Sequence, residues 1–132
     1  EGLSYSIYTW FSASPLDETA SFNVSAIFAP QNKARVESAV REELARALKE
    51  GFTAEEVETA KRGLLEARRL ARTNDSSLAG RLATYLFLDR SFAWDVDFER
   101  RIAALTPADL QAALKRHLDT AKLAVSKAGD FR

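Results

Sequence analysis

Hydrophobic and polar residues alternate along two stretches near the beginning of the chain. Residues 5–12 are rich in aromatic and β-branched residues and show no helical period, which favours a β-strand. Residues 20–29 alternate more regularly, because apolar residues stand at every second position with serine or asparagine between most of them. Pro15 and Asp17 are turn-forming residues in the short connection. This pattern predicts an antiparallel β-hairpin.

After Pro30 the apolar residues recur every three or four positions, which is typical of amphipathic helices. The longest helix follows Gly51, and Thr53 with Glu56 has the spacing of a capping box at its start. Gly63 lies inside this helix, where glycine costs roughly 1 kcal/mol relative to alanine, and it indicates a close crossing by another element. The predicted helices cover residues 32–50, 53–74, 76–88, 94–105 and 107–118.

A last β-compatible run, KLAVSKA, covers residues 122–128 and predicts a strand that returns to the hairpin. The predicted fold class is therefore α+β: an antiparallel or mixed sheet, made of the hairpin and the C-terminal strand, is covered by a layer of about five helices. With 132 residues, 46% of them hydrophobic, we expect residues 1–132 to form a single domain. The chain opens directly into a strand, so we expect it to be part of a longer protein.

Composition excludes several classes of function. The formal net charge is zero, which gives no global attraction to nucleic acid, and no apolar run has the length of a membrane span. The chain has no cysteine and a single histidine, His117, whereas a catalytic zinc needs about three protein ligands. We therefore expect neither a metal site nor a catalytic residue in this chain.

Three further features favour ordinary structural roles. His117 lies on or beside the apolar face of the last helix and is interpreted as a packing or surface residue. The carboxylates at residues 55, 56 and 58 are interpreted as a helix start. Basic residues along the long helix alternate with glutamates and have no aromatic platform beside them, which favours a solvated helix face over phosphate binding; they are Lys61, Arg62, Arg68, Arg69 and Arg72.

Four segments, in order and spread over nearly the whole chain, resemble one family. The segments are EGLSY at residues 1–5, GFTAEEV with AK at residues 51–57 and 60–61, LTPADL at residues 105–110, and LAV with GD at residues 123–125 and 129–130. Together they resemble the C-terminal homologous domain of the insulinase/pitrilysin zinc peptidases, the domain that does not bind zinc.

This resemblance implies a peptidase in which a homologous N-terminal domain binds zinc through an H-x-x-E-H helix. That motif is absent from this sequence, so zinc is expected in the partner domain, within the same chain or in a companion subunit. The family domain contributes an arginine and a tyrosine that bind a peptide or unfolded protein substrate near the scissile bond. Tyr5 matches the tyrosine, and the arginine would lie upstream of Glu1.

Two readings from other classes stay open. Related domains also serve as catalytically inactive scaffold subunits of larger assemblies, and a free-standing binding module is compatible with the same residues. The alternative for Tyr5 is an ordinary strand aromatic that fills the core. An H-x-x-E-H motif in the parent protein would favour the peptidase. The sequence leaves the compartment open, a periplasmic or otherwise exported location included.

Overall fold

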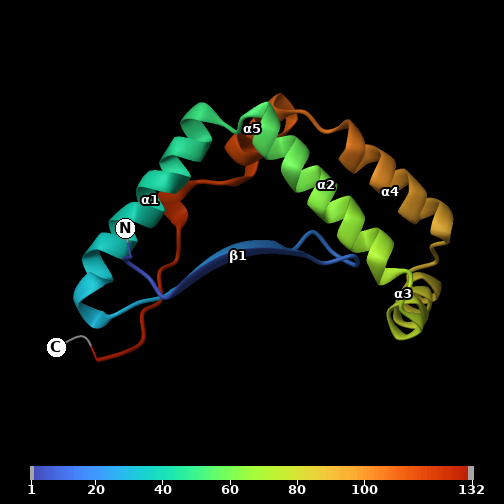
Figure 1. Cartoon of the computed structure of the whole chain (residues 1–132), viewed down its shortest axis with the longest axis horizontal. Helices are drawn as coiled ribbons and strands as arrows, with labels where there is room; N and C mark the ends of the chain where they lie inside the picture. The colour runs from blue at the N-terminus through green and yellow to red at the C-terminus, as the bar shows by residue number, and fades with distance from the viewer. Residues whose placement is uncertain (1, 131–132) are drawn as a thin grey trace. The chain divides into compact units, whose positions relative to one another are not determined.

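The computed structural model describes residues 2–130 and confirms the α+β class (Figure 1). The described chain divides into two compact units. The first contains the chain up to Lys49 and the segment from Leu118 onwards, and the second is Glu50–His117. The first unit contains the strands β1 (Ser6–Ala13) and β2 (Ala20–Ile27) and, apart from its last residue, the helix α1 (Lys33–Glu50). The helices of the second unit are α2 (Ala54–Ala71), α3 (Asp75–Phe87), α4 (Phe92–Ala104) and α5 (Pro107–His117).

The predicted hairpin is confirmed. Strands β1 and β2 pair in antiparallel orientation, with Ile7 opposite Ala26 and Phe11 opposite Phe22. At the turn the Ser14 amide donates to the Thr19 carbonyl at 2.9 Å, and the Asp17 carboxylate accepts from the Thr19 amide at 3.0 Å. A short aspartate side chain that accepts a bond two residues on stabilises such turns. The turn therefore fixes the register of the two strands.

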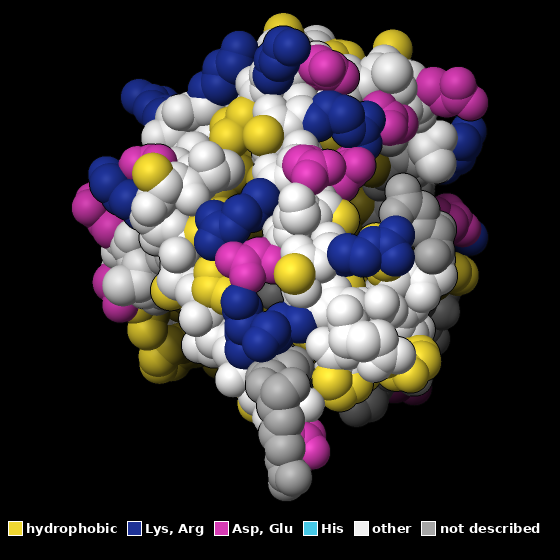
Figure 2. All heavy atoms as spheres, turned by 90° about the vertical axis from the view of Figure 1, so that its left-hand side faces the viewer, with side chains coloured by type: hydrophobic (Ala, Val, Ile, Leu, Met, Phe, Trp, Pro, Cys, Tyr) yellow, Lys and Arg dark blue, Asp and Glu magenta, His cyan; other side chains and the backbone are white. Residues whose placement is uncertain are grey.

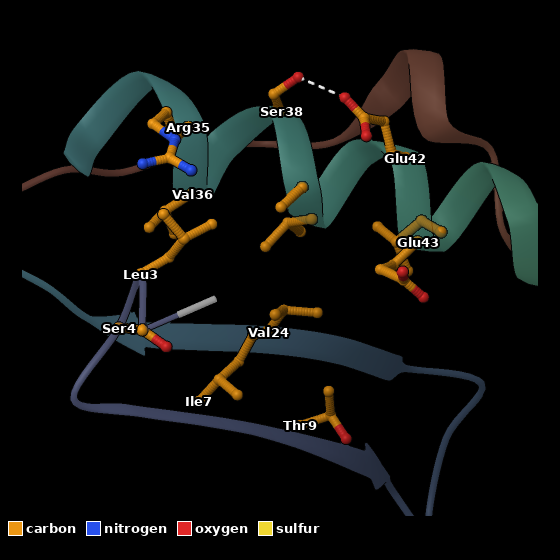
Figure 3. A pocket seen from close by; sticks show the side chains of 14 residues that line it. Leu3, Ser4, Ile7, Thr9, Val24, Arg35, Val36, Ser38, Glu42 and Glu43 are labelled. Carbon is orange, nitrogen blue, oxygen red and sulfur yellow. Dashed lines mark hydrogen bonds between the residues drawn. The ribbon is translucent and has the colours of Figure 1, made fainter.

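Helix α1 lies along one face of the hairpin (Figure 3). A 3-10 turn, Pro30–Asn32, leads into it because proline fixes the backbone angle that a helical start requires. The Asn32 amide group donates to the Leu3 carbonyl at 3.0 Å and so ties the segment before β1 to the start of the helix. Val36, 7% exposed, is the buried residue of α1.

The predicted C-terminal strand is not formed. A 3-10 turn, Thr120–Lys122, is followed by residues 123–128 without regular structure, and the sheet has two strands within residues 2–130. A strand needs a neighbouring backbone, but a cavity of about 280 Å³ lies between β2 and Leu123–Lys127. The ammonium of Lys127 instead pairs with the carboxylate of Glu37 in α1. A β-compatible composition alone therefore does not make residues 122–128 a strand.

In the second unit, α2 and α4 pack side by side (Figure 1). The capping box predicted for α2 is present: the Thr53 hydroxyl accepts from the Glu56 amide at 3.2 Å, and Glu56 accepts from the Thr53 amide at 2.8 Å. Thr106 and Asp109 make the same reciprocal pair before α5. None of the described helices has the length and apolarity needed to cross a bilayer.

The close crossing predicted at Gly63 is wrong. A Cβ atom built on Gly63 would meet nothing within 4 Å. The glycine therefore faces open space within the described structure, and no neighbouring backbone requires it. Gly51 differs, because its φ of +74° lies in the left-handed region and Gln111 approaches its Cβ position to 3.3 Å.

Candidate functional site

Tyr5, the residue predicted to bind substrate, lies directly before β1. Its amide donates to the Ile27 carbonyl at 2.7 Å, so its backbone continues the hairpin although the strand itself begins at Ser6. The side chain is 77% exposed. Within residues 2–130 no hydrogen-bond partner of the Tyr5 hydroxyl is found. The hairpin therefore holds the backbone of Tyr5 and leaves its hydroxyl open to another molecule.

A cavity of about 680 Å³ lies beside this segment, between the hairpin and α1 (Figure 3). Ile7, Thr9 and Val24 line it from the hairpin, because alternate residues of paired strands point to the same face. Leu3, from the segment before β1, lies beside Val36 of α1 at one end of the cavity (Figure 3). The segment before β1 and the hairpin thus share one wall of an apolar cavity.

Polar groups of α1 surround this cavity without forming a catalytic set. Ser38 donates to Glu42 at 2.6 Å along the helix, and Arg46 pairs with Glu43. Residues 2–130 contain no group of three or more His, Cys, Asp or Glu side chains that could hold a metal ion. On the face shown in Figure 2, basic and acidic side chains are interspersed. The cavity offers apolar contacts from the hairpin and α1, and Tyr5 is not among the residues that line it.

The other candidates take structural positions. His117 is exposed at the end of α5, and the acidic residues Glu55 and Glu56 lie in the first turn of α2. Glu58 pairs with Lys61 at 2.6 Å. The interpretation of the carboxylates as a helix start is confirmed for Glu55 and Glu56.

The interpretation of the basic run as a solvated face is only partly right. Arg62 and Arg69 are exposed, and Arg69 pairs with Glu66 at 2.6 Å on the helix surface. The side chains of Lys61 and Arg68, however, are 13% and 18% exposed. The Lys61 ammonium donates to the Leu105 carbonyl at 3.1 Å, beyond the last turn of α4. Three of the five residues, Lys61, Arg68 and Arg72, therefore connect α2 to α4 or to its end.

Sequence reasoning missed a buried cluster of charges around Asp95, which is 2% exposed. The Tyr85 hydroxyl and the Arg68 guanidinium donate to one oxygen of the Asp95 carboxylate, and Arg81 donates to the other at 2.9 Å. Glu99, one turn further along α4, accepts from Arg68 at 3.0 Å and pairs with Arg72. One signal was available: Arg68 with Arg72 and Asp95 with Glu99 both have i,i+4 spacing, so two helix faces carry matching opposite charges.

This environment shifts two pKa values in opposite directions. Burial raises the pKa of Asp95, but hydrogen bonds from Tyr85 and Arg81 and the charge of Arg68 outweigh it, so the pKa lies below its ordinary value. Burial, assisted by the neighbouring carboxylate, raises the pKa of the Tyr85 hydroxyl. Asp95 is thus a charged acceptor and Tyr85 a neutral donor. The cluster stabilises α2, α3 and α4 against one another.

Comparisons with known proteins agree with the resemblance seen in the sequence. A sequence profile described as the peptidase M16 inactive domain matches residues 1–64. No match is found among curated protein sequences. The crystal structure of a peptidase M16 inactive domain from Pseudomonas fluorescens matches 92% of the chain at 25% identity, with a TM-score of 0.77. The periplasmic protease PqqL from Escherichia coli matches 86% of the chain at 18% identity, with a TM-score of 0.68, and shares the fold.

The chain covers 28% of the first of these solved chains and 12% of the second. Both solved chains are thus several times longer than this one. The profile match contains Tyr5, the hairpin and α1, and the structural match extends over nearly the whole chain. Residues 1–64 thus match the peptidase M16 inactive-domain family, and the chain is similar in fold to a solved domain of that family.

Proposed function

We propose that this chain is part of the substrate-binding, non-catalytic half of a zinc-dependent endopeptidase. In this proposal residues 1–132 act as one domain of a larger protein, and a homologous domain, in the same chain or a companion subunit, holds the zinc. The described residues of this chain do not fit a zinc site, because they supply no cluster of three possible ligands. The substrate is a peptide or an unfolded protein.

The exposure of Tyr5 carries the proposal. A tyrosine that filled the core would be buried and its hydroxyl would have a partner. Tyr5 is instead 77% exposed, at a position that the profile match includes. In the assembled enzyme its hydroxyl would donate to the substrate carbonyl and stabilise the negative charge that develops on that oxygen.

The test is Tyr5→Phe in the complete protein together with its zinc-binding domain. Loss of one oxyanion donor typically lowers turnover on the order of a hundredfold, so we expect a decrease of that size. Zinc content and melting temperature should be unchanged, since the exposed hydroxyl contributes little to folding. Peptide hydrolysis, metal analysis and thermal melting are measured on the same samples.

Tyr8→Phe is the matched control. Tyr8 lies on β1, is 53% exposed and stacks on Trp10 at 5.7 Å between ring centroids. Tyr8→Phe makes the same chemical change as Tyr5→Phe at a nearby residue of the same segment. It should leave turnover equal to that of the wild type. Equal turnover in all three proteins would remove Tyr5 from the site and favour the inactive scaffold subunit.

A further inference from the structure

The segment before β1 is held by two hydrogen bonds, one on each side of Ser4. On one side the Leu3 carbonyl accepts from the side-chain amide of Asn32 at 3.0 Å. On the other side the Tyr5 amide donates to the Ile27 carbonyl at 2.7 Å. Leu3 and Ser4 are half-buried, whereas Tyr5, at which the chain bends, is exposed. The backbone that leads into Tyr5 is therefore fixed although the side chain of Tyr5 is exposed.

Both of these partners belong to the connection between β2 and α1. Ile27 is the last residue of β2, and Asn32 is the last residue of the 3-10 turn that begins at Pro30. The backbone N–H of Asn32 donates to the Ala29 carbonyl at 2.8 Å and closes this turn. Because proline fixes its own φ angle, the backbone that carries Asn32 has few alternative conformations. The connection therefore presents the side-chain amide of Asn32 to Leu3 from a well-defined position.

The bond from Asn32 to Leu3 needs a side chain that donates. A carbonyl oxygen only accepts hydrogen bonds, and an asparagine amide supplies two N–H groups. An ionised aspartate has nearly the same shape but only accepts. The bond is partly buried, so its loss would leave the Leu3 carbonyl without this partner in a partly desolvated place. Such a loss favours movement of the segment that leads into Tyr5.

The position of the Tyr5 backbone decides where its hydroxyl lies. The hydroxyl is at the far end of a rigid ring, and two side-chain torsions join that ring to the backbone. Any movement of the backbone is therefore carried to the hydroxyl. A donor that stabilises developing charge must be in place before the reaction, and a displacement of about 1 Å can lower a rate on the order of a hundredfold.

We propose that Asn32 is a positioning residue for Tyr5: its side-chain amide, through the Leu3 carbonyl, holds the backbone that aims the Tyr5 hydroxyl at the substrate carbonyl. This inference rests on the proposed function, because it gives Asn32 a role in turnover only through the Tyr5 hydroxyl. Asn32 should therefore influence the rate while that hydroxyl is present and should lose its influence when the hydroxyl is removed.

The test is a double-mutant cycle in the complete protein with its zinc-binding domain: wild type, Asn32→Asp, Tyr5→Phe and both changes together. Asn32→Asp removes the donor, and an acidic residue directly before α1 suits the helix dipole, so the variant should fold. We expect it to lower kcat about tenfold with KM unchanged, because the hydroxyl acts in the transition state. Added to Tyr5→Phe, the same change should lower kcat by less than about twofold.

Three results of the cycle would contradict the proposal in different ways. A merely structural role would lower kcat by the same factor in both backgrounds, and this result would overturn the positioning role. Unchanged kcat in Asn32→Asp, beside a loss in Tyr5→Phe, would overturn it and leave the proposed function in place. No loss in Tyr5→Phe would overturn the proposed function and the role of Asn32 with it. Asn32→Ala, which lacks the donor and carries no charge, should give the same pattern as Asn32→Asp.

Hydrogen exchange in the same proteins gives a measurement that does not depend on turnover. Asn32→Asp should speed exchange of the Tyr5 amide up to about tenfold, the effect of losing one hydrogen bond beside it. The Ser14 amide, which bonds across the turn end of the hairpin, should exchange as in the wild type. Unchanged exchange of the Tyr5 amide would show that Asn32 does not hold this segment and would overturn the proposal.

Asn23→Asp is the matched control. Asn23 donates to the Ser21 hydroxyl at 3.1 Å, within β2, so this variant loses the same kind of donor at another place in the hairpin. Its kcat and the exchange of its Tyr5 amide should equal those of the wild type. Equal changes in Asn23→Asp and Asn32→Asp would overturn the proposal, because the effect would then not depend on the bond to Leu3.

Discussion

The hydroxyl of Tyr85 in α3 donates a hydrogen bond to the carboxylate of Asp95 in α4, and both residues are buried. Arg68 of α2 and Arg81 of α3 bind the same carboxylate. One side chain of α4 therefore joins three helices of the second unit. A buried charge is tolerated only when it is paired and hydrogen-bonded, so the four groups depend on one another.

Replacing Asp95 with asparagine should destabilise the protein strongly. The change keeps the size of the side chain but leaves Arg68 and Arg81 without their buried anion. Breaking a buried ion pair by removing one partner costs about 3 kcal/mol or more of the free energy of unfolding. Urea unfolding of Asp95→Asn against the wild type measures this loss.

Asp97→Asn, two residues along the same helix, is the control. Asp97 pairs with Arg101 at 2.6 Å and with Arg100, but these arginine side chains are 74% and 72% exposed. Exposed pairs contribute about 0–1 kcal/mol, so the control should unfold nearly as the wild type does. Similar losses in the two variants would mean that the Asp95 cluster contributes no more than a surface pair.

The same cluster predicts a loss of stability in acid. Despite burial, hydrogen bonds and nearby arginines hold the pKa of Asp95 below its ordinary value of 3.8, and a hydrogen bond from Arg72 lowers the pKa of Glu99 below 4.5. A carboxyl group whose pKa is lower in the folded state contributes stability above its unfolded pKa and loses it as the pH falls through the folded pKa. The free energy of unfolding should therefore fall from about pH 4.5 downwards.

Urea unfolding at a series of pH values tests this, with Asp95→Asn as the comparison. The variant lacks one of the titrating carboxylates, so its stability should fall less steeply with acid. Surface carboxylates with lowered pKa values, such as Glu37 and Asp109, remain in both proteins and set the residual slope. Parallel curves for the two proteins would show that Asp95 is not the group responsible.

Local signals predicted the elements well because their causes are local. The hairpin follows from a period of two around a turn, and the starts of α2 and α5 follow from Thr53 and Thr106 with an acidic residue three positions on. The three-residue spacing between a capping residue and its partner can be seen directly in the sequence. Asn74 caps α3 in the same local way, accepting from the Ser77 amide at 2.9 Å.

The predictions that failed depend on contacts between distant parts of the chain, which the local sequence does not specify. Residues 122–128 have the composition of a strand, but a cavity lies between them and β2. The sequence predicted a close neighbour at Gly63, but in the described structure a Cβ atom built there would meet nothing within 4 Å. Arg68 was predicted to face solvent, because nothing local shows that Asp95, 27 positions on, approaches it. Tyr5, the predicted site residue, is exposed directly before β1, and its role stays a prediction.

The capping box at the start of α2 should be measurable as stability. Thr53→Ala removes the hydroxyl that accepts from the Glu56 amide and leaves that amide without its cap. We expect a loss of about 1 kcal/mol, the usual cost of losing a threonine cap. Thr59→Ala, inside the same helix, should be neutral or slightly stabilising because alanine has the higher helix propensity. Equal melting temperatures for both variants would show that other groups hold the first turn.

Alanine should have opposite effects at Gly63 and Gly51. Gly63 is inside α2, and an added Cβ meets nothing within 4 Å, so Gly63→Ala should stabilise the protein by up to about 1 kcal/mol through helix propensity and a less flexible unfolded chain. Gly51 has a φ of +74°, and a Cβ there would lie 3.3 Å from Gln111. Gly51→Ala should therefore destabilise by about 1 kcal/mol or more, the cost of the left-handed conformation for a residue with a Cβ atom.

The melting temperatures of the two variants, compared with that of the wild type, separate the effect of backbone conformational preference from the effect of packing. Melting temperatures on opposite sides of the wild-type value are the expected result. A lower value for Gly63→Ala would show that another part of the protein approaches α2 at this glycine, as the sequence had first indicated. A higher value for Gly51→Ala would mean that the turn between α1 and α2 relaxes away from Gln111 and does not need the left-handed conformation.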